Sequence, residues 1–337
     1  MTDSKRQGIY ILANDDFIED AIALLNSLRQ HAPDYPVRLI PYDDRHQRVA
    51  QLLRDKFGVE KFEDQYLFDV FEKHARAILG RSAPMCRTLA MWFGPFDEFI
   101  YLDVDIVVFQ NQRDVFDMLT EYDFVCCADG RTLGIKHVFT ERVLERNLFT
   151  EQEINYLFNT GMYASKKGVL GYAQLISLLE ETATIPDIFL PYYQDQTILN
   201  YLVLRAIPKR ADLRDFTPAI PDDAWAGLSN LKVRKDKAYK VYNTELPARH
   251  LHWAGFKQIA SRPHVGLWLM YRYPGKVGAI KRPLVRLWWL ISRITRRVLC
   301  THDEGWYTPS YQLKRAQRII SRRITSRLQQ AVRNGKI

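Results

Sequence analysis

Residues 99–109 have the sequence FIYLDVDIVVF, in which two aspartates interrupt a hydrophobic run. The apolar residues 99–102 are typical of a buried strand, and a buried charge is costly unless it is paired or bound to a metal. A strand that ends at Asp103 would place both carboxylates at the carboxyl edge of a sheet. Because side chains alternate along an extended chain, Asp103 and Asp105 should point the same way. The segment therefore predicts either half of a site for a hard divalent cation or a strand end with two solvated aspartates.

Around this segment, short apolar runs alternate with amphipathic ones. This alternation predicts strands separated by helices, and hence an α/β fold with a mostly parallel sheet that is covered on both faces. Residues 208–247, rich in Pro, Asp and Lys, are expected to be mostly loop. The expected strands are 8–13, 37–41, 99–102 and 124–128, and the expected helices are 16–30, 49–57 and 84–93.

The charge of the chain is unevenly distributed. The 337 residues carry a net charge of +9, and residues 265–337 contain 16 Lys and Arg against 2 Asp and Glu. That segment therefore carries +14, and the difference, 9 − 14, leaves −5 for residues 1–264. A mildly acidic body argues against a core that binds nucleic acid. We expect two domains, a globular body at 1–264 and a basic helical extension at 265–337.

The C-terminal extension has an amphipathic pattern. Apolar residues recur at helical spacing in 281–299 and less regularly in 313–333, and arginines fall mainly on the other side. Basic amphipathic helices with tryptophan are typical of anionic membrane surfaces, although a helical subdomain packed on the body is the alternative. No stretch approaches the ~18 apolar residues of a membrane span. We therefore expect a cytoplasmic protein, peripheral on the inner face of the membrane if the helices bind lipid.

Five more motifs accompany the aspartate pair, in order along the chain. They are ILANDDF at 11–17, Arg87 in the helix expected before the central strand, FNTGM at 158–162, DQ at 195–196, and HLHWAGFK at 250–257. Together the six motifs, between Gly8 and Lys257, resemble the family-eight glycosyltransferases, the retaining group that includes glycogenin and bacterial galactosyltransferases. The resemblance implies a GT-A-type nucleotide-diphospho-sugar transferase fold.

The resemblance implies that the first motif holds the nucleotide. Ala13, Asn14 and Asp15 would contact base and ribose, and Phe17 would stack on uracil where the family usually has tyrosine. Asn14 and Asp15 also suit helix N-capping, so both interpretations stay open. Similar enzymes have a basic residue at the position of Arg87, near the donor phosphates, where a guanidinium can bind phosphate oxygens.

The resemblance assigns the donor sugar to the two middle motifs. Asn159 and Gly161 would line the sugar pocket, because an amide offers both donors and an acceptor and glycine permits close approach. Asp195 and Gln196 would lie at the reacting carbon of the donor, with Gln196 as the first catalytic candidate and Asp195 as the second. An aspartate at the start of a helix also suits N-capping, which explains Asp195 but not Gln196.

The last motif would complete the metal site. The resemblance implies that His252 joins Asp103 and Asp105, and that Gly255 and Lys257 hold the diphosphate. The family element is His-x-x-Gly-x-x-Lys-Pro-Trp, whereas here the lysine comes one residue early and Pro-Trp is absent. Mixed carboxylate and imidazole ligands suit Mn²⁺ better than Mg²⁺.

The implied reaction is transfer of a hexose from a UDP-sugar to a hydroxyl of a carbohydrate or lipid-linked acceptor, with retention. Two alternatives stay open. A nucleotidyltransferase would need a glycine-rich loop after the first strand, but residues 13–16 contain no glycine. A non-catalytic membrane-associated protein with a degenerate site is the other. The identities of the sugar and of the acceptor do not follow from the sequence.

Overall fold

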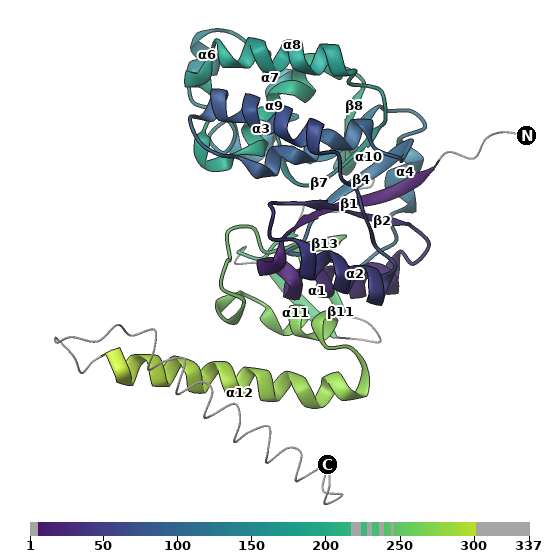
Figure 1. Ribbon diagram of the computed structural model, residues 1–337, viewed down its shortest axis with the longest axis vertical. Coiled ribbons are helices and arrows are strands. Elements are labelled where there is room, and N and C mark those ends of the chain that lie inside the picture. The colour runs from purple at the N-terminus through teal and green to yellow at the C-terminus, as the bar shows by residue number, and fades with distance from the viewer. Residues whose placement is uncertain (1–5, 217–223, 228–230, 236–238, 244–245, 301–337) are drawn as a thin grey trace, which may run out of the picture. The chain divides into compact units, whose positions relative to one another are not determined.

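The computed structural model describes residues 6–216, 224–227, 231–235, 239–243 and 246–300. Its main element is a seven-stranded sheet of order β3-β2-β1-β4-β7-β6-β8 (Figure 1). Only β7 runs antiparallel to its described neighbours β4 and β6, so the expectation of a mostly parallel sheet is confirmed. The strands are β1 (Gln7–Ala13), β2 (Val37–Pro41), β3 (Glu60–Lys61), β4 (Glu98–Asp103), β6 (Phe124–Ala128), β7 (Phe158–Lys166) and β8 (Arg210–Asp212).

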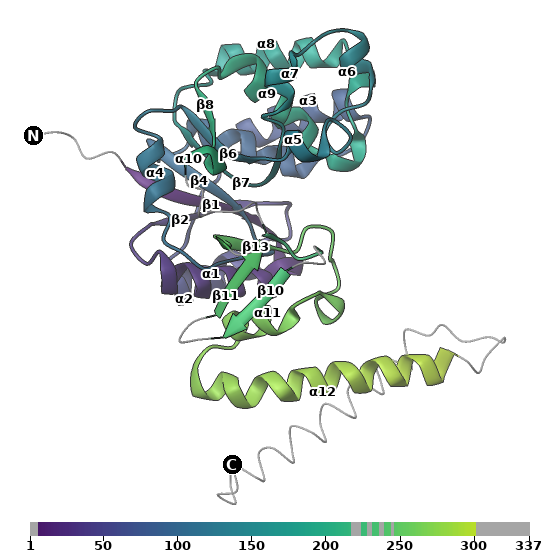
Figure 2. The ribbon, with the colours of Figure 1, turned by 180° about the vertical axis from the view of Figure 1, so that it is seen from behind.

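Helices cover both faces of this sheet, as Figures 1 and 2 show. Alternation along β1 sends Tyr10 into one core and Ile9 and Ile11 into the other. The first core contains side chains of α3 (Gln65–Leu79), η2 (Pro84–Phe93), α8 (Tyr172–Ala183) and α9 (Asp195–Ala206). The second contains side chains of α1 (Ile18–His31), α2 (Gln47–Phe57) and α4 (Arg113–Met118).

A small second sheet, of order β5-β13-β9, lies where the site is built. Its strands are β5 (Ile106–Val108), β13 (His250–His252) and β9 (Ala224–Trp225). β13 pairs antiparallel with β5 and parallel with β9, so the motif at 250–257 lies beside the segment that follows β4.

The expectation of mostly loop at 208–247 was wrong for the residues that the structure describes there. They form β8, β9, α10 (Leu213–Phe216), and a small antiparallel sheet of β10 (Leu231–Lys235), β11 (Tyr239–Asn243) and β12 (Leu246–Pro247). Short strands with many charged residues give no clear hydrophobic alternation, which is why the sequence pattern missed them.

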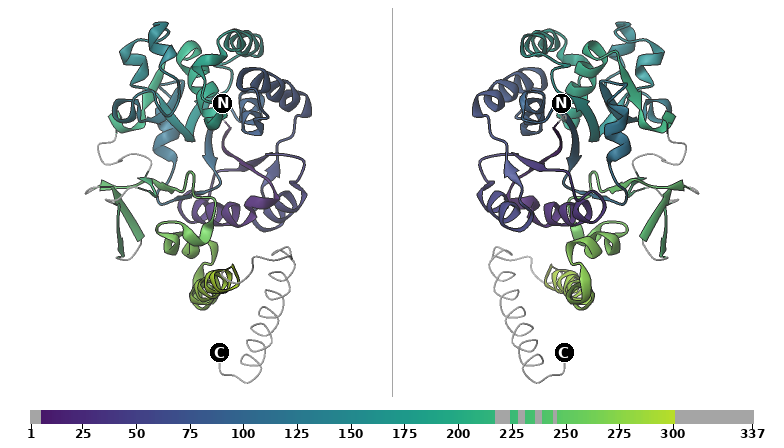
Figure 3. Two further views of the ribbon diagram at one scale, coloured as in Figure 1. Left: turned by 90° about the vertical axis from the view of Figure 1, so that its left-hand side faces the viewer. Right: turned by 90° about the vertical axis from the view of Figure 1, so that its right-hand side faces the viewer.

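The C-terminal part begins with α11 (Val265–Arg272), which lies beside α1 (Figure 3). Asn26 of α1 donates to the Tyr271 carbonyl at 2.7 Å. The first compact unit ends at Arg282, inside α12 (Gly275–Cys300). None of the described helices combines the length and the apolar character needed to cross a bilayer. The second amphipathic segment, 313–333, lies outside the described residues.

Candidate active site

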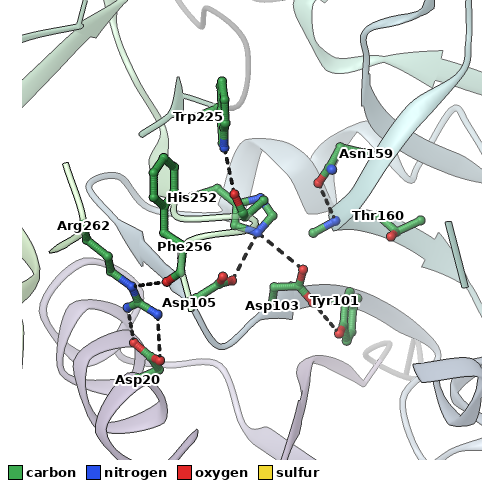
Figure 4. A network of polar contacts seen from close by, with 12 residues as sticks. Asp20, Tyr101, Asp103, Asp105, Asn159, Thr160, Trp225, His252, Phe256 and Arg262 are labelled. Carbon is green, nitrogen blue, oxygen red and sulfur yellow. Dashed lines mark hydrogen bonds and ion pairs between the residues drawn. The ribbon is translucent and has the colours of Figure 1, made fainter. Parts of the chain in front are cut away.

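Three side chains from two sheets meet at one point, which we call the aspartate–histidine corner: Asp103, Asp105 and His252. Asp103 ends β4, Asp105 follows in the turn to β5, and His252 ends β13. The His252 Nε2 lies 3.1 Å from Asp105 Oδ1 and 3.4 Å from Asp103 Oδ2 (Figure 4). One ligand atom from each residue lies within 4.8 Å of the others. The sequence pattern and the resemblance both pointed to these residues.

The backbone holds the corner from both sides. His252 pairs in register with Ile106, and the Trp253 amide donates to the Asp105 carbonyl at 3.1 Å. The Tyr101 hydroxyl donates to Asp103 Oδ1 at 2.7 Å, which orients that carboxylate. The turn between β4 and β5 is thus pinned to β13.

The charges in the corner are strongly coupled. Burial alone would lower the pKa of His252, but the negative charges of Asp105 and Asp103 raise it to about 10. Burial alone would raise the pKa of Asp105, but the positive charge of His252 holds it below its ordinary value. His252 must lose a proton before Nε2 can bind a metal, so cation binding here competes with protonation.

Two observations show that these residues fit a divalent cation. The buried His252 Nε2 faces two carboxylates at ion-pair distance and has no other partner in the described structure. Gly161 of β7 passes so close that a Cβ there would lie 2.2 Å from His252 Cε1. Two carboxylates and one imidazole form a ligand set that Mn²⁺ accepts, and their ligand atoms already converge on one point.

A chain of amide hydrogen bonds joins β7 to α9 beside the corner. The Gly161 amide donates to Asn159 Oδ1 at 2.9 Å, and Asn159 Nδ2 donates to Gln196 Oε1 at 3.0 Å. Gln196 Nε2 in turn donates to the His137 carbonyl at 2.8 Å. Three residues that the resemblance assigned to the donor sugar are therefore in direct contact with one another.

The sequence did not point to His137 or to its partner. His137 Nε2 lies 2.6 Å from Asp129 Oδ1, which fixes the segment whose carbonyl orients Gln196. The two residues lie eight positions apart in a region without periodicity, so no local signal identified them.

Asp195 is a buried carboxyl at the first position of α9. Gln194 occupies the N-cap, with a positive φ of 43°, so Asp195 does not cap the helix from that position. Burial first, and the negative charge of Asp103 second, raise the pKa of Asp195 to about 7. Its Oδ2 has no hydrogen-bond partner in the described structure. A carboxyl whose pKa is about 7 therefore lies beside Gln196.

The turn after β1 contains the residues assigned to the nucleotide. Asn14 Oδ1 accepts from the Asp16 amide at 3.0 Å and so caps the short helix η1 (Asp15–Phe17). Asn14 Nδ2 donates to Asp43 Oδ2 at 2.8 Å. Ala13 is buried at the end of β1, whereas the Phe17 ring is partly exposed and free to contact a ligand.

Asp15 and Arg87 both hold structural elements together. Asp15 Oδ1 accepts from the Val49 amide at 2.8 Å, so it caps the first turn of α2 rather than its own helix. Arg87 is buried; its Nε donates to Glu72, and its Nη1 donates to the Pro41 carbonyl at 3.0 Å. Asn14 and Asp15 thus both cap helices, which is one of the two roles considered for them. The binding of donor phosphates by Arg87 stays a prediction.

The loop after His252 is anchored to α1 by a second charged cluster, which we call the support cluster: Asp20, Arg262 and Trp268. Arg262 forms a two-pronged pair with Asp20, and the Trp268 indole donates to Asp20 Oδ1 at 2.8 Å. Arg262 Nε also donates to the Phe256 carbonyl at 2.9 Å. Phe256 lies between Gly255, whose φ is 83°, and the exposed Lys257. The binding of the diphosphate by Gly255 and Lys257 stays a prediction.

Comparisons with known proteins agree with this architecture. Residues 6–123 match a family described as "Mannosyltransferase putative". Galactinol synthases 7 and 4 of Arabidopsis thaliana are each 25% identical, over 214 and 205 residues, and each comparison covers 57% of this chain and 58% of the relative. The chain thus matches less than two thirds of the length of these relatives. The apo structure of the WbbM bifunctional glycosyltransferase superposes with a TM-score of 0.53 at 13% identity, covering 81% of this chain and 50% of that one.

The superposition shows that the chain has the GT-A-type fold of this glycosyltransferase structure, as the sequence predicted. The similarity to two galactinol synthases agrees with the predicted resemblance to the family-eight glycosyltransferases.

Proposed function

We propose that this protein transfers a hexose from a UDP-sugar to a hydroxyl acceptor with retention, using a divalent cation, Mn²⁺ or Mg²⁺, held by Asp103, Asp105 and His252. The proposal rests on the meeting of two carboxylates and a buried imidazole nitrogen, whose ligand atoms lie within 4.8 Å of one another. When bound, such a cation supplies positive charge to a diphosphate leaving group.

The other residues of the site would position the donor. Gln196 has both ends of its amide fixed, by Asn159 and by the His137 carbonyl, so its placement relative to the sugar would be preorganised. Asp195, with a pKa of about 7, would present a carboxyl that can donate or accept a hydrogen bond near neutral pH. The backbone and side chain of Lys257 would bind the diphosphate.

Thermal unfolding with nucleotides tests the donor and the cation together. UDP with Mn²⁺ should raise the melting temperature of the wild type more than either alone, because a ligand selective for the folded state stabilises it. Asp105→Ala should remove this shift and the Mn²⁺-dependent hydrolysis of the UDP-sugar, whereas Asp69→Ala, at an exposed position of α3, should change neither. A shift with GDP and none with UDP would refute the donor assignment. Undiminished hydrolysis by Asp105→Ala would refute the metal site.

We also propose that α12 binds the anionic inner surface of a membrane, which would make the protein cytoplasmic and peripheral. The helix contains no acidic residue, and large apolar side chains on it are between 39% and 66% exposed: Val277, Ile280, Leu287, Trp288 and Leu290. Lys and Arg residues alternate with them along the helix. An exposed apolar stripe with a basic complement favours an interface of acyl chains and anionic headgroups.

Sedimentation with vesicles tests this second proposal. The wild type should bind vesicles that contain phosphatidylserine and bind pure phosphatidylcholine weakly. Replacing Leu287 and Trp288 together by glutamate should abolish binding and leave UDP-sugar hydrolysis intact, because neither residue belongs to the site. Equal sedimentation of the variant and the wild type would show that α12 does not bind the membrane.

A further inference from the structure

Trp225 is an exposed aromatic residue beside the aspartate–histidine corner. Its side chain is 42% exposed, and it ends β9, the edge strand of the small sheet. Trp225 pairs in register with His252 across the parallel strands β9 and β13. Side chains of residues paired in this way project from the same face of a sheet, so the indole lies on the face to which His252 points. Figure 4 shows the indole next to His252.

Three contacts fix the orientation of this ring. The indole Nε1 donates to the Ala254 carbonyl at 3.0 Å, and the Phe256 ring lies with its centroid 5.9 Å away at a tilt of 33°. Gly227 allows the chain to fold back under the indole, because a Cβ there would lie 2.4 Å from its six-membered ring. An apolar face held in one orientation loses little conformational freedom when a ligand covers it.

The position of the indole indicates which ligand covers it. The turn assigned to the nucleotide base follows β1 of the main sheet, whereas Trp225 lies on a different sheet, on the side of the corner that β13 provides. A flat apolar surface beside polar groups suits a ligand with an apolar face and a polar rim. A pyranose ring has this character, since its C–H bonds form faces and its hydroxyls form an edge.

We propose that Trp225, supported by Phe256, is a platform on which the acceptor binds through the face of a pyranose ring. The inference rests on the proposed transferase function and extends it, because it assigns a sugar as the acceptor and a residue that selects it. Water needs no platform, so hydrolysis of the donor and transfer to a sugar depend on Trp225 to different degrees.

The test measures both reactions with one UDP-sugar and Mn²⁺. The acceptor probes are the methyl pyranosides of glucose, galactose and mannose. Trp225→Ala should raise the KM for the accepted pyranoside about threefold to tenfold, as loss of an aromatic contact predicts, and leave hydrolysis within about twofold. Trp225→Phe should retain part of the affinity, because it keeps an aromatic face. Tyr66→Ala, at an exposed aromatic residue of α3, should change neither reaction.

The other possible outcomes contradict either the platform or the proposed transferase function. An unchanged acceptor KM in Trp225→Ala, or an equal loss of hydrolysis and transfer, contradicts the platform. Hydrolysis by the wild type without transfer to any of the pyranosides also contradicts it. A wild type that neither hydrolyses nor transfers refutes the proposed function itself, which is a distinguishable result.

Discussion

Two buried charged clusters lie at the two ends of one loop, and they differ in how completely their polar groups are satisfied. In the support cluster, Asp20 accepts from Arg262 and from the Trp268 indole, and Arg262 also donates to a backbone carbonyl. In the aspartate–histidine corner, the buried His252 Nε2 has only the carboxylates of Asp103 and Asp105 as partners, and the nearby Asp195 Oδ2 has none in the described structure. A saturated cluster serves the fold, whereas an unsaturated one keeps binding capacity for a ligand.

This difference follows from how the loop is attached at its two ends. The support cluster ties the loop carbonyl at Phe256 to α1, and the loop begins at His252. The well-paired support cluster therefore holds one end of the loop, and the less completely paired aspartate–histidine corner lies at the other end. Breaking the first cluster should cost stability, whereas altering the second should cost activity and change stability little or even favourably.

The largest effect on stability is expected from Arg262→Ala. The substitution leaves Asp20 buried without its cation, and burial already raises the pKa of Asp20. Removal of one partner of a buried pair typically lowers the free energy of unfolding by about 3–5 kcal/mol. Urea unfolding followed by fluorescence measures it, with Arg262→Lys as a partial rescue. A change below about 1 kcal/mol would contradict the supporting role of this cluster.

Asp195→Asn should stabilise the protein in a pH-dependent way. The pKa of Asp195 is about 7 in the folded protein against an ordinary 3.8, so the folded state binds more protons between these values. Wild-type stability therefore falls as pH rises through that window, and the asparagine variant escapes this loss. At pH 8 it should be more stable by at most about 4 kcal/mol, with little difference at pH 4. Melting temperatures across this range measure the effect, and a constant difference would refute it.

Gly161→Ala should cause an intermediate loss. The new Cβ would lie 2.2 Å from the His252 ring, so either β7 or the imidazole must move. Overpacking of this kind costs about 1–3 kcal/mol, and displacement of His252 should also weaken Mn²⁺-dependent hydrolysis. Gly171→Ala is the matched control, because nothing lies within 4 Å of its Cβ position. Equal behaviour of the two variants would show that close approach at 161 has no role.

The smallest effect on stability is expected from Asp105→Asn. His252 keeps Asp103 as a partner and can release its proton, so the free energy of unfolding without metal should fall less than in Arg262→Ala. The stabilisation by Mn²⁺ should disappear together with hydrolysis. A large loss of stability in the metal-free variant would place this corner with the support cluster, as a structural element.

Part of the site followed from the chain alone. Asp103 and Asp105 interrupt a hydrophobic strand, a local pattern that physical chemistry explains without tertiary information. The resemblance added His252, Asn159 and Gln196, which the structure brings near that pair or into contact with each other. It did not show that Arg87 is already paired with Glu72, because such a partner depends on how α3 packs against η2.

The class of fold, the strand β4 and the acidic pair could be predicted from the sequence, because hydrophobic periodicity and buried charge are local properties of the chain. Which distant residues surround that pair depends on how the chain packs in three dimensions. Asp20 and Arg262 lie 242 positions apart, and Trp225 reaches His252 through the pairing of two short strands. Neither contact leaves a pattern along the sequence, since the partners meet only after the two sheets and α1 have packed.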